Sequence, residues 1–370
     1  MKIIKLIFIN ILILLTLLVF AEILFRSLKY AKSCYTKSKC EISRLFSTEL
    51  IISTPVTIGL SKYDPELGYV PLPKFDKFIP IEKAPDWYGS KVSIDKYGFR
   101  KNDNNIRFKT EKKILVSGDS FTFGDQVNNN ETWPACLENK IGKEVDNAGV
   151  FGYGTAQALR RIIKILEENN EIYDTIILSN LLYLNFNRDK YSFRSGFPIP
   201  AVIKDKKGHL LYADTPDYNV KGSRFNKDEK ITFFENSIKN IFRYSFLLKY
   251  LQDKTGVINN IILARDEIHP NAAPRDEVIE WVIQKFSKIN KEKFILLQYP
   301  VNSMEVLDEI HKERKVILSN AKKYNIKVID TYNQIINNKE FNSLYFPFGH
   351  HNQKGNNLVC QFLNTEMKLK

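Results

Sequence analysis

A serine that directly follows a short apolar run is the first residue of this chain in the setting of a nucleophile. The run from Lys113 to Ser117 has the composition of a buried strand, and the tripeptide Gly118-Asp119-Ser120 comes next. A serine on the tight turn between a strand and a helix is exposed, and its oxygen lies among backbone N–H groups without an acceptor inside the helix. Such groups can stabilise the oxyanion of acyl transfer. The alternative is a Gly-Asp-Ser turn that only caps the next helix.

A histidine near the C-terminus is placed to act as the base for this serine. The chain has five histidines, and His350 comes just before the last predicted helix. The main rival is His269, which follows Asp266 in an Asp-x-x-His spelling. His269 precedes a helix and two further strands instead of closing the fold, so its place in the topology argues against it. We therefore predict that Ser120 and His350 form a nucleophile and base pair.

The segments around these residues alternate between strand and helix patterns. Such alternation predicts a parallel sheet covered by helices on both faces, with ligands bound beyond the carboxyl ends of the strands. We expect a flavodoxin-like three-layer α/β/α domain over 111–370, with an insertion at about 186–271. The expected strands are 113–117, 144–147, 174–178, 293–297 and 326–330, and the expected helices are 131–141, 155–168, 277–289, 307–324 and 355–367, with Thr155 as a helix cap.

The first residues, 1–30, predict a membrane anchor. Leu6 to Phe25 is a run of 20 residues with three polar interruptions, and a helix of that length spans about 30 Å, the hydrocarbon thickness of a bilayer. A cleaved signal peptide is the alternative, because Val19-Phe20-Ala21 is an acceptable cleavage site. More basic residues follow the run than precede it, which the positive-inside rule associates with the cytoplasm. We nevertheless expect an extracytoplasmic catalytic domain, joined to the anchor by a stalk and packing layer over 31–110.

Composition argues against several other classes of protein. The 55 lysines and arginines against 42 aspartates and glutamates give a net charge of +13, which favours polyanions or anionic lipid. The lysines are dispersed and form no arginine-rich stripe, so we expect no nucleic-acid partner. No Cys/His metal spacing is present, and we expect no metal and no cofactor. Cys34 and Cys40 could form a disulfide in an oxidising compartment, whereas Cys136 and Cys360 are interpreted as buried thiols.

The order of these segments resembles the SGNH, or GDSL-type, hydrolase family. The phrase from Ile114 to Gly124 is similar to the first block of that family, whose serine is the nucleophile. The next strand ends in Asn147-Ala148-Gly149, which is similar to the second block, whose glycine donates a backbone N–H to the oxyanion hole. The resemblance implies Ser120 as nucleophile, and the N–H groups of Ser120 and Gly149 as oxyanion donors. An ordinary turn glycine is the alternative for Gly149.

The third block departs from the family pattern. The family usually ends a strand with Gly-x-Asn-Asp, whose asparagine is the third oxyanion donor, and that pattern is absent here. Asn185 resembles the block best by its position before Arg188, with Asn180 and Asn187 as alternatives. A plain polar turn is a further alternative.

The last block resembles a His-x-Asn-x-x-Gly form that begins at His350. The family's acid usually stands three or two residues earlier, where this chain has Pro347 and Phe348. The alternatives are a Ser-His dyad oriented by a backbone carbonyl, a carboxylate borrowed from elsewhere such as Asp330, or a weakened enzyme. Asp119 and His351 are expected to support the pair.

The resemblance covers residues 64–370, and the phrases 64–69 and 97–100 are similar to those of membrane-anchored bacterial members. It implies a serine esterase in the periplasm or at the outer face of the membrane, acting on an ester-bearing envelope glycan or a small ester. An O-acetyltransferase of a cell-surface polysaccharide would use the same residues. A non-catalytic glycan-binding protein of the same fold is the alternative outside enzymes.

Overall fold

The computed structural model of the chain describes residues 10, 13, 16–24, 26–28, 59–79, 89–104, 108, 111–219, 225, 266–301, 303–346 and 349–367. Within the predicted anchor, residues 16–24 are helical. No helix in the described parts of the chain is both long and apolar enough to cross a bilayer. The rest of the predicted span from Leu6 to Phe25 is described only at residues 10 and 13, and the predicted Cys34 and Cys40 pair lies outside the described residues.

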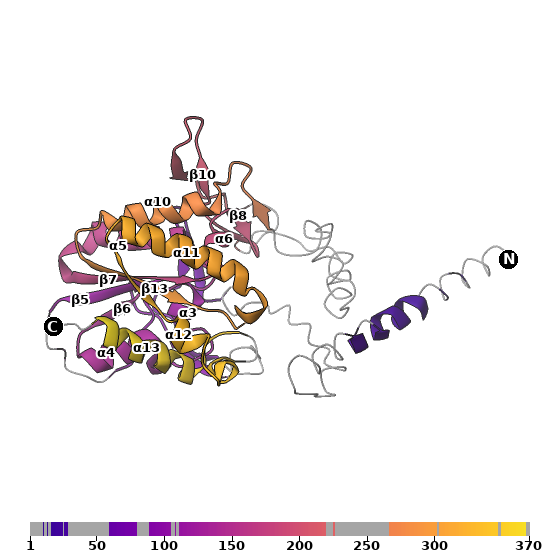
Figure 1. Ribbon diagram of the computed structural model, residues 1–370, viewed down its shortest axis with the longest axis horizontal. Helices are drawn as coiled ribbons and strands as arrows, with labels where there is room; N and C mark the ends of the chain where they lie inside the picture. Colours follow the sequence, from indigo (N-terminus) through magenta and orange to yellow (C-terminus); the bar gives the residue numbers. More distant parts are fainter. Residues whose placement is uncertain are drawn as a thin grey trace.

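A five-stranded parallel sheet forms the centre of the main domain (Figure 1). Its strands are β5 (Lys113–Ser117), β6 (Val145–Asn147), β7 (Tyr173–Leu181), β13 (Glu292–Gln298) and β14 (Lys327–Asp330). The order across the sheet is β14-β13-β7-β5-β6, and each neighbouring pair is parallel. Numbered by their place in the chain, the strands are ordered 2-1-3-4-5, which is the predicted flavodoxin-like order. The order reverses between β5 and β7, which is where such sheets bind ligands.

Helices cover both faces of this sheet (Figure 1). One face carries α4 (Trp133–Ile141) and α13 (Gln353–Met367), and the other carries α5 (Thr155–Asn169), α10 (Arg275–Ser287) and α11 (Leu307–Lys323). The middle of β5 and residues 176–178 of β7 are apolar without alternation, as expected for strands that are buried on both sides. Each predicted strand and helix is present, with ends that differ by three residues or fewer.

The start of α5 differs from the prediction of a Thr155 cap. Gly154 is the N-cap residue, and the carboxylate of Asp189 accepts the backbone N–H of Ala156 at 3.0 Å and of Gln157 at 3.4 Å. A Cβ on Gly154 would lie 2.0 Å from Asp189 Oδ1, so the close approach requires glycine. The distant cap fixes α5 to the segment that follows β7.

Two antiparallel hairpins precede the sheet and contribute to the same core. β1 (Ser61–Asp64) pairs with β2 (Gly68–Pro71), and β3 (Asp76–Ile79) pairs with β4 (Ser90–Ser93). Tyr69 and Val92 from these hairpins are buried in one cluster with the strands of the sheet. The described part of the predicted packing layer therefore rests on the main domain.

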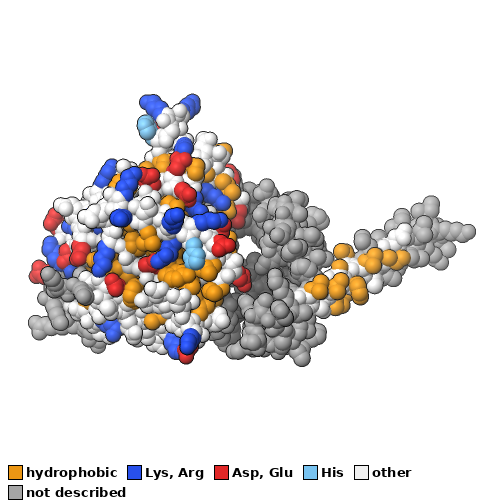
Figure 2. Space-filling view, viewed as in Figure 1, with side chains coloured by type: hydrophobic (Ala, Val, Ile, Leu, Met, Phe, Trp, Pro, Cys, Tyr) orange, Lys and Arg blue, Asp and Glu red, His pale blue; other side chains and the backbone are white. Residues whose placement is uncertain are grey.

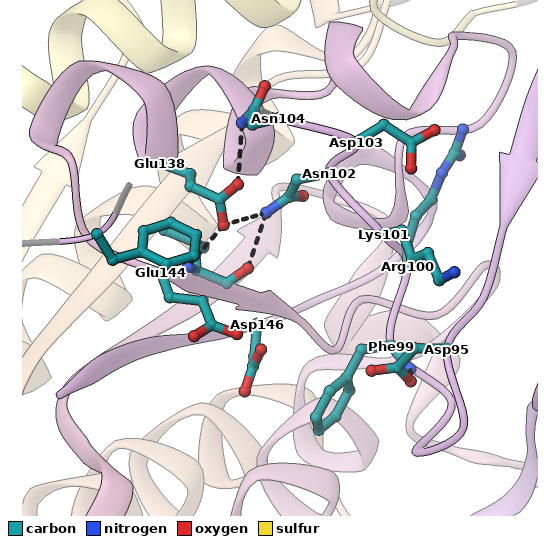
Figure 3. A pocket seen from close by; sticks show the side chains of 12 residues that line it. Asp95, Phe99, Arg100, Lys101, Asn102, Asp103, Asn104, Glu138, Glu144 and Asp146 are labelled. Carbon is teal, nitrogen blue, oxygen red and sulfur yellow. Dashed lines mark hydrogen bonds between the residues drawn. The ribbon is translucent and has the colours of Figure 1, made fainter. Parts of the chain in front are cut away.

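A hollow of about 240 Å³ lies where this layer meets α4 (Figure 3). Inside it, Asn102 and Asn104 donate side-chain N–H groups to the carboxylate of Glu138 at 2.8 and 3.0 Å. The backbone N–H of Val145 donates to the same carboxylate at 3.0 Å. These bonds join the layer to α4 and β6, and none of the residues of the predicted active site lines this hollow.

The predicted insertion is described at its two ends. The short helix α6 (Asn185–Arg188) follows β7, and β8 (Tyr191–Arg194) then pairs with β9 (Phe197–Pro198) and β12 (Glu267–Ile268). A hairpin of β10 (Val202–Lys204) and β11 (Leu210–Tyr212) projects from the molecule, with basic side chains at its tip (Figure 2). Elsewhere on the face shown in Figure 2, acidic and basic side chains are interspersed.

Cys136 and Cys360 differ from the prediction of buried free thiols, because they form a disulfide. Cys136 lies on α4 and Cys360 on α13, and these helices pack against each other. Each cysteine lies on a helix, as its sequence pattern predicts, but the packing of the two helices brings the sulfur atoms together. The bond joins residues 224 positions apart and fixes the C-terminal helix to the first half of the domain.

Candidate active site

Ser120 is the first residue of α3 (Ser120–Phe123), just beyond the carboxyl end of β5. The carboxylate of Asp119 caps this helix by accepting the N–H of Phe121 at 3.0 Å. Ser120 is only 5% exposed, less than a turn position alone predicts, because His350 lies against its hydroxyl. Among the described residues, nothing accepts the backbone N–H of Ser120. The serine therefore has the predicted strand-end position and an available N–H, whereas the prediction that it is exposed is wrong.

The structure brings His350 to Ser120 from the far end of the chain. Nε2 of His350 lies 2.9 Å from the Oγ of Ser120, which is hydrogen-bonding distance. Nδ1 of the same ring lies 3.0 Å from the Oε1 of Gln126. The imidazole is thus held between the hydroxyl and an amide, which is the geometry of a serine and its base with the second ring nitrogen anchored.

No carboxylate occupies the usual place of the triad acid in the described part of this site. Positions 347 and 348 lie outside the described residues. Asp330, one of the predicted alternatives, is held elsewhere, because its carboxylate accepts from Arg314 at 2.6 Å and from Tyr299 at 2.7 Å. The carboxylate that faces the ring is Asp125, whose Oδ2 lies 3.8 Å from Nε2 of His350.

Burial lowers the pKa of both histidines of the last block. The pKa of His350 falls to about 4, because its ring is desolvated and the positive charge of Arg188 is near. The pKa of His351 falls to about 3, because of desolvation and the neighbouring His350. Both rings are therefore neutral at pH 7, and a neutral His350 is the form that can accept a proton.

His351 supports the site by packing instead of by hydrogen bonding. The residue is 2% exposed, and its ring packs against Phe121 and Tyr345 with centroids 4.8 Å away in each case. Neither ring nitrogen has a partner among the described residues. His351 thus fixes the loop that carries His350 against the helix that carries Ser120.

Arg188 links the segments that follow β5 and β7. Its Nη1 donates to Asp119 Oδ2 at 3.0 Å, to Asn185 Oδ1 at 3.0 Å and to the carbonyl of Tyr153 at 3.1 Å. The side chain of Asp119 is fully buried, so this ion pair compensates a charge that would otherwise be costly. Asp119 therefore caps the helix of Ser120 and anchors Arg188, and its supporting role in the reaction stays a prediction.

Asn185 is distinguished from the two alternative asparagines by its unpaired amide nitrogen. Its Oδ1 accepts from Arg188, which directs Nδ2 away, and that buried Nδ2 has no partner in the described structure. Asn180 uses its amide to donate to Glu313 at 3.5 Å, and Asn187 donates to the carbonyl of Tyr183 at 2.5 Å. Asn185 is thus the asparagine with a donor left for a ligand.

Gly149 does not have the free N–H that the second block predicts. Its N–H donates to the side-chain oxygen of Asn147 at 3.0 Å. A Cβ on Gly149 would lie 2.4 Å from the nitrogen of Phe123, so this glycine allows β6 to pack closely against α3. Gly152 lies three residues later in a left-handed turn with φ +77°, and its N–H has no acceptor within the described ranges. Gly152 is therefore the candidate oxyanion donor in place of Gly149.

Arg100 holds the loop that contacts His350. Its guanidinium donates to the carbonyls of Phe123 at 3.2 Å and Val127 at 2.6 Å, and to the side chain of Asn129 at 3.3 Å. The residue is 1% exposed, and burial lowers its pKa to about 10. Arg100 belongs to the packing layer, so that layer positions the loop over 124–127 and does not merely connect the anchor to the domain.

The remaining sequence candidates lie apart from this site. Nδ1 of His269 accepts the backbone N–H of Asn271 in a turn of the insertion, and no contact between His269 and Ser120 is present. Gln126, Arg188 and Arg100 belong to the site although their sequence context does not predict it. The signal for Gln126 and Arg188 is proximity to the first and third blocks, and the signal for Arg100 is its place in the phrase 97–100. No spacing rule marks a neutral amide as the partner of a histidine. Within the described ranges, no three histidine, cysteine, aspartate or glutamate residues form a group that could hold a metal.

Comparisons with known proteins give structural neighbours only. No protein-family model matches the sequence, and the comparison with curated proteins found no match. The structural neighbours are SGNH and GDSL-type hydrolases. A lipolytic protein of the G-D-S-L family from Veillonella parvula is 14% identical, with a TM-score of 0.39, and 70% of this chain covers 100% of it.

Two further neighbours are named for ester-cleaving activities. The lipase/acylhydrolase from Enterococcus faecalis is 16% identical with a TM-score of 0.38, and 70% of this chain covers 95% of it. A variant of Axe2, an acetyl-xylooligosaccharide esterase from Geobacillus, is 12% identical with a TM-score of 0.35, and 72% of this chain covers 98% of it. At such identities and TM-scores the likeness establishes neither activity nor substrate, so the functional conclusion rests on the geometry above.

Proposed function

We propose that the chain is a serine-dependent ester hydrolase with Ser120 as nucleophile and His350 as general base. The observation that carries this proposal is the 2.9 Å contact between Ser120 Oγ and His350 Nε2, with the other ring nitrogen held by Gln126. Nε2 takes the hydroxyl proton while Oγ forms a bond to the ester carbonyl carbon. The protonated imidazole then gives that proton to the departing alcohol oxygen, leaving an acyl-serine that water cleaves by the reverse sequence.

The oxyanion formed in each step needs donors, and three are available. We assign the backbone N–H groups of Ser120 and Gly152 and the side-chain N–H of Asn185, because none of them has an acceptor in the described structure. Arg188 fixes the Asn185 amide in the required orientation through its oxygen. Preorganised donors of this kind each contribute about 10²–10³-fold to turnover.

An acyl ester on a cell-envelope glycan is the proposed substrate, and a small ester is the simpler alternative. The apolar run from Leu6 to Phe25 favours anchorage at a membrane, and the Cys136–Cys360 disulfide favours an oxidising compartment. The catalytic domain is therefore proposed to lie outside the cytoplasm, held near the envelope. The insertion that follows β7 begins beside Asn185 and Arg188, which supports a role for it in contacting the glycan.

The test is hydrolysis of 4-nitrophenyl acetate by the full-length protein in detergent. We expect measurable turnover in the wild type, and a loss of about 10²–10⁴-fold in His350→Ala and at least as much in Ser120→Ala. His269→Ala is the matched control and should keep wild-type turnover, because His269 lies outside the site. Equal hydrolysis by wild type and Ser120→Ala would refute the proposal.

Adding an acetylated envelope polysaccharide distinguishes the possible acceptors. A hydrolase releases free acetate from the glycan, and the release requires Ser120. An acyltransferase instead gives a newly acetylated glycan when a small acetyl ester is supplied. A wild-type protein that binds the glycan but shows neither reaction would support the binding-protein alternative.

A further inference from the structure

The proposed reaction needs a residue that orients the imidazole of His350, and the sequence does not identify one. The imidazole of His350 must keep its proton on Nδ1, so that Nε2 presents a lone pair to the serine hydroxyl. In serine hydrolases a carboxylate usually holds that proton. The group that faces Nδ1 here is the side-chain amide of Gln126, whose Oε1 lies 3.0 Å away. Building on the proposed function, we infer that Gln126 is the positioning residue for His350 and replaces the triad acid.

An amide oxygen can perform the orienting part of the acid's role. Oε1 of Gln126 only accepts hydrogen bonds, so a 3.0 Å contact with Nδ1 requires the proton to be on Nδ1. Nε2 is then free of a proton and faces Ser120 Oγ at 2.9 Å. The opposite tautomer would set two lone pairs against each other at Gln126. The geometry therefore selects the tautomer that can act as a base.

The loop around Gln126 is built to hold this side chain in place. Gln126 is 3% exposed, and its backbone has φ +74°, in the left-handed region that side chains other than glycine adopt at a cost of about 1–2 kcal/mol. Arg100 donates to the carbonyl of Val127 on one side and of Phe123 on the other. A strained, non-glycine residue fixed by a buried arginine indicates that its side chain is needed at this position.

The charges around His350 set its pKa, so the absence of charge on Gln126 affects the pH range in which the base stays neutral. Asp125 approaches Nε2 at 3.8 Å, Arg188 acts through its positive charge, and His351 adjoins the ring in the chain. Gln126 adds no negative charge at Nδ1, so nothing there offsets the burial that lowers the pKa of His350 to about 4. The base stays unprotonated in mildly acidic solution, and we expect hydrolysis to persist down to about pH 5.

Two substitutions of Gln126 separate orientation from charge. Gln126→Glu keeps an acceptor at Nδ1 and adds the missing negative charge, so the acidic limb of the kcat/KM profile should move up by about one to three pH units. Gln126→Gly removes the acceptor while relieving the φ +74° strain, so it should remain folded. Its kcat should fall by about 10²–10⁴-fold with KM within about threefold, as when a base loses its orienting partner. The matched control is Gln353→Ala, an exposed glutamine three residues from His350.

Nuclear magnetic resonance of ¹⁵N-histidine in the full-length protein gives a readout that does not depend on catalysis. The inference predicts the His350 proton on Nδ1 in the wild type and a raised titration midpoint in Gln126→Glu. A wild-type proton on Nε2, or wild-type titration and kcat in both Gln126 variants, would overturn it. If no variant and no wild type hydrolyses esters while Gln126→Glu still raises the midpoint, the proposed function fails and the positioning of His350 by Gln126 is supported.

Discussion

The buried ring of His351 should make the free energy of unfolding fall in acid. Replacing His351 by a residue that cannot be protonated should remove this effect. His351 is 2% exposed, has no polar partner within the described residues and has a pKa lowered from 6.5 to about 3. Because the native state binds this proton more weakly than the unfolded chain, stability is unaffected above about pH 6.5 and falls as the pH drops below it. At pH 4.5 the unfolded histidine is protonated and the native one is not. Because pH 4.5 lies two units below the unfolded pKa, this difference lowers the free energy of unfolding by about 3 kcal/mol.

The assay compares urea unfolding of wild type and His351→Phe at pH 7.5 and pH 4.5. Phenylalanine keeps an aromatic ring against Phe121 and Tyr345 but cannot be protonated. Any change in packing is the same at both pH values and cancels, as do the carboxylates common to both proteins. The free energy of unfolding of the variant relative to wild type should therefore rise by about 3 kcal/mol between pH 7.5 and pH 4.5. A difference that stays constant within about 0.5 kcal/mol would refute the buried, uncharged state of His351.

Three further substitutions test the elements that support the site. Arg188→Met should lower the free energy of unfolding by about 3–5 kcal/mol, because it leaves the Asp119 carboxylate buried without its positive partner. The same substitution should lower it much less in a protein that already carries Asp119→Asn. Arg100→Lys cannot reach all its acceptors, so urea unfolding should show a loss of about 2–4 kcal/mol, and kcat should fall more than KM rises. Cys360→Ser removes a disulfide between residues 224 positions apart, so it should lower the free energy of unfolding by up to about 5 kcal/mol. Alkylation of the denatured, unreduced wild type should leave Cys136 unmodified.

The sequence predicts the centre of the sheet well because β5, β7 and β13 each contain a short apolar run that is buried on both faces. β5 was predicted with the same ends that the structure shows. β7 extends through Leu181, three residues past the predicted end, because Ser179 and Asn180 are polar yet buried. Ser179 accepts a hydrogen bond from Gln298 of the neighbouring strand at 2.7 Å, so a tertiary contact overrides the local pattern.

The nucleophile and base were predictable, whereas the groups that orient them were not. Ser120 and His350 follow from their positions at the ends of a strand and before the last helix. Gln126 carries no signal in the sequence, because its role depends on a left-handed turn that brings a neutral amide to Nδ1 of a distant histidine. The choice between Gly149 and Gly152 likewise depends on which N–H the side chain of Asn147 accepts, and sequence spacing does not encode that choice.

The most direct test of the central claim is to map the site of a fluorophosphonate adduct. The full-length protein would be treated with a serine-directed fluorophosphonate, digested and analysed by mass spectrometry. The proposed pair predicts one phosphonylated residue at Ser120, because His350 at 2.9 Å activates that hydroxyl above the other serines. The adduct should be absent from Ser120→Ala and strongly reduced in His350→Ala. A folded wild type that forms no adduct, or a Ser120→Ala protein that is labelled as fast as wild type, would contradict the claim.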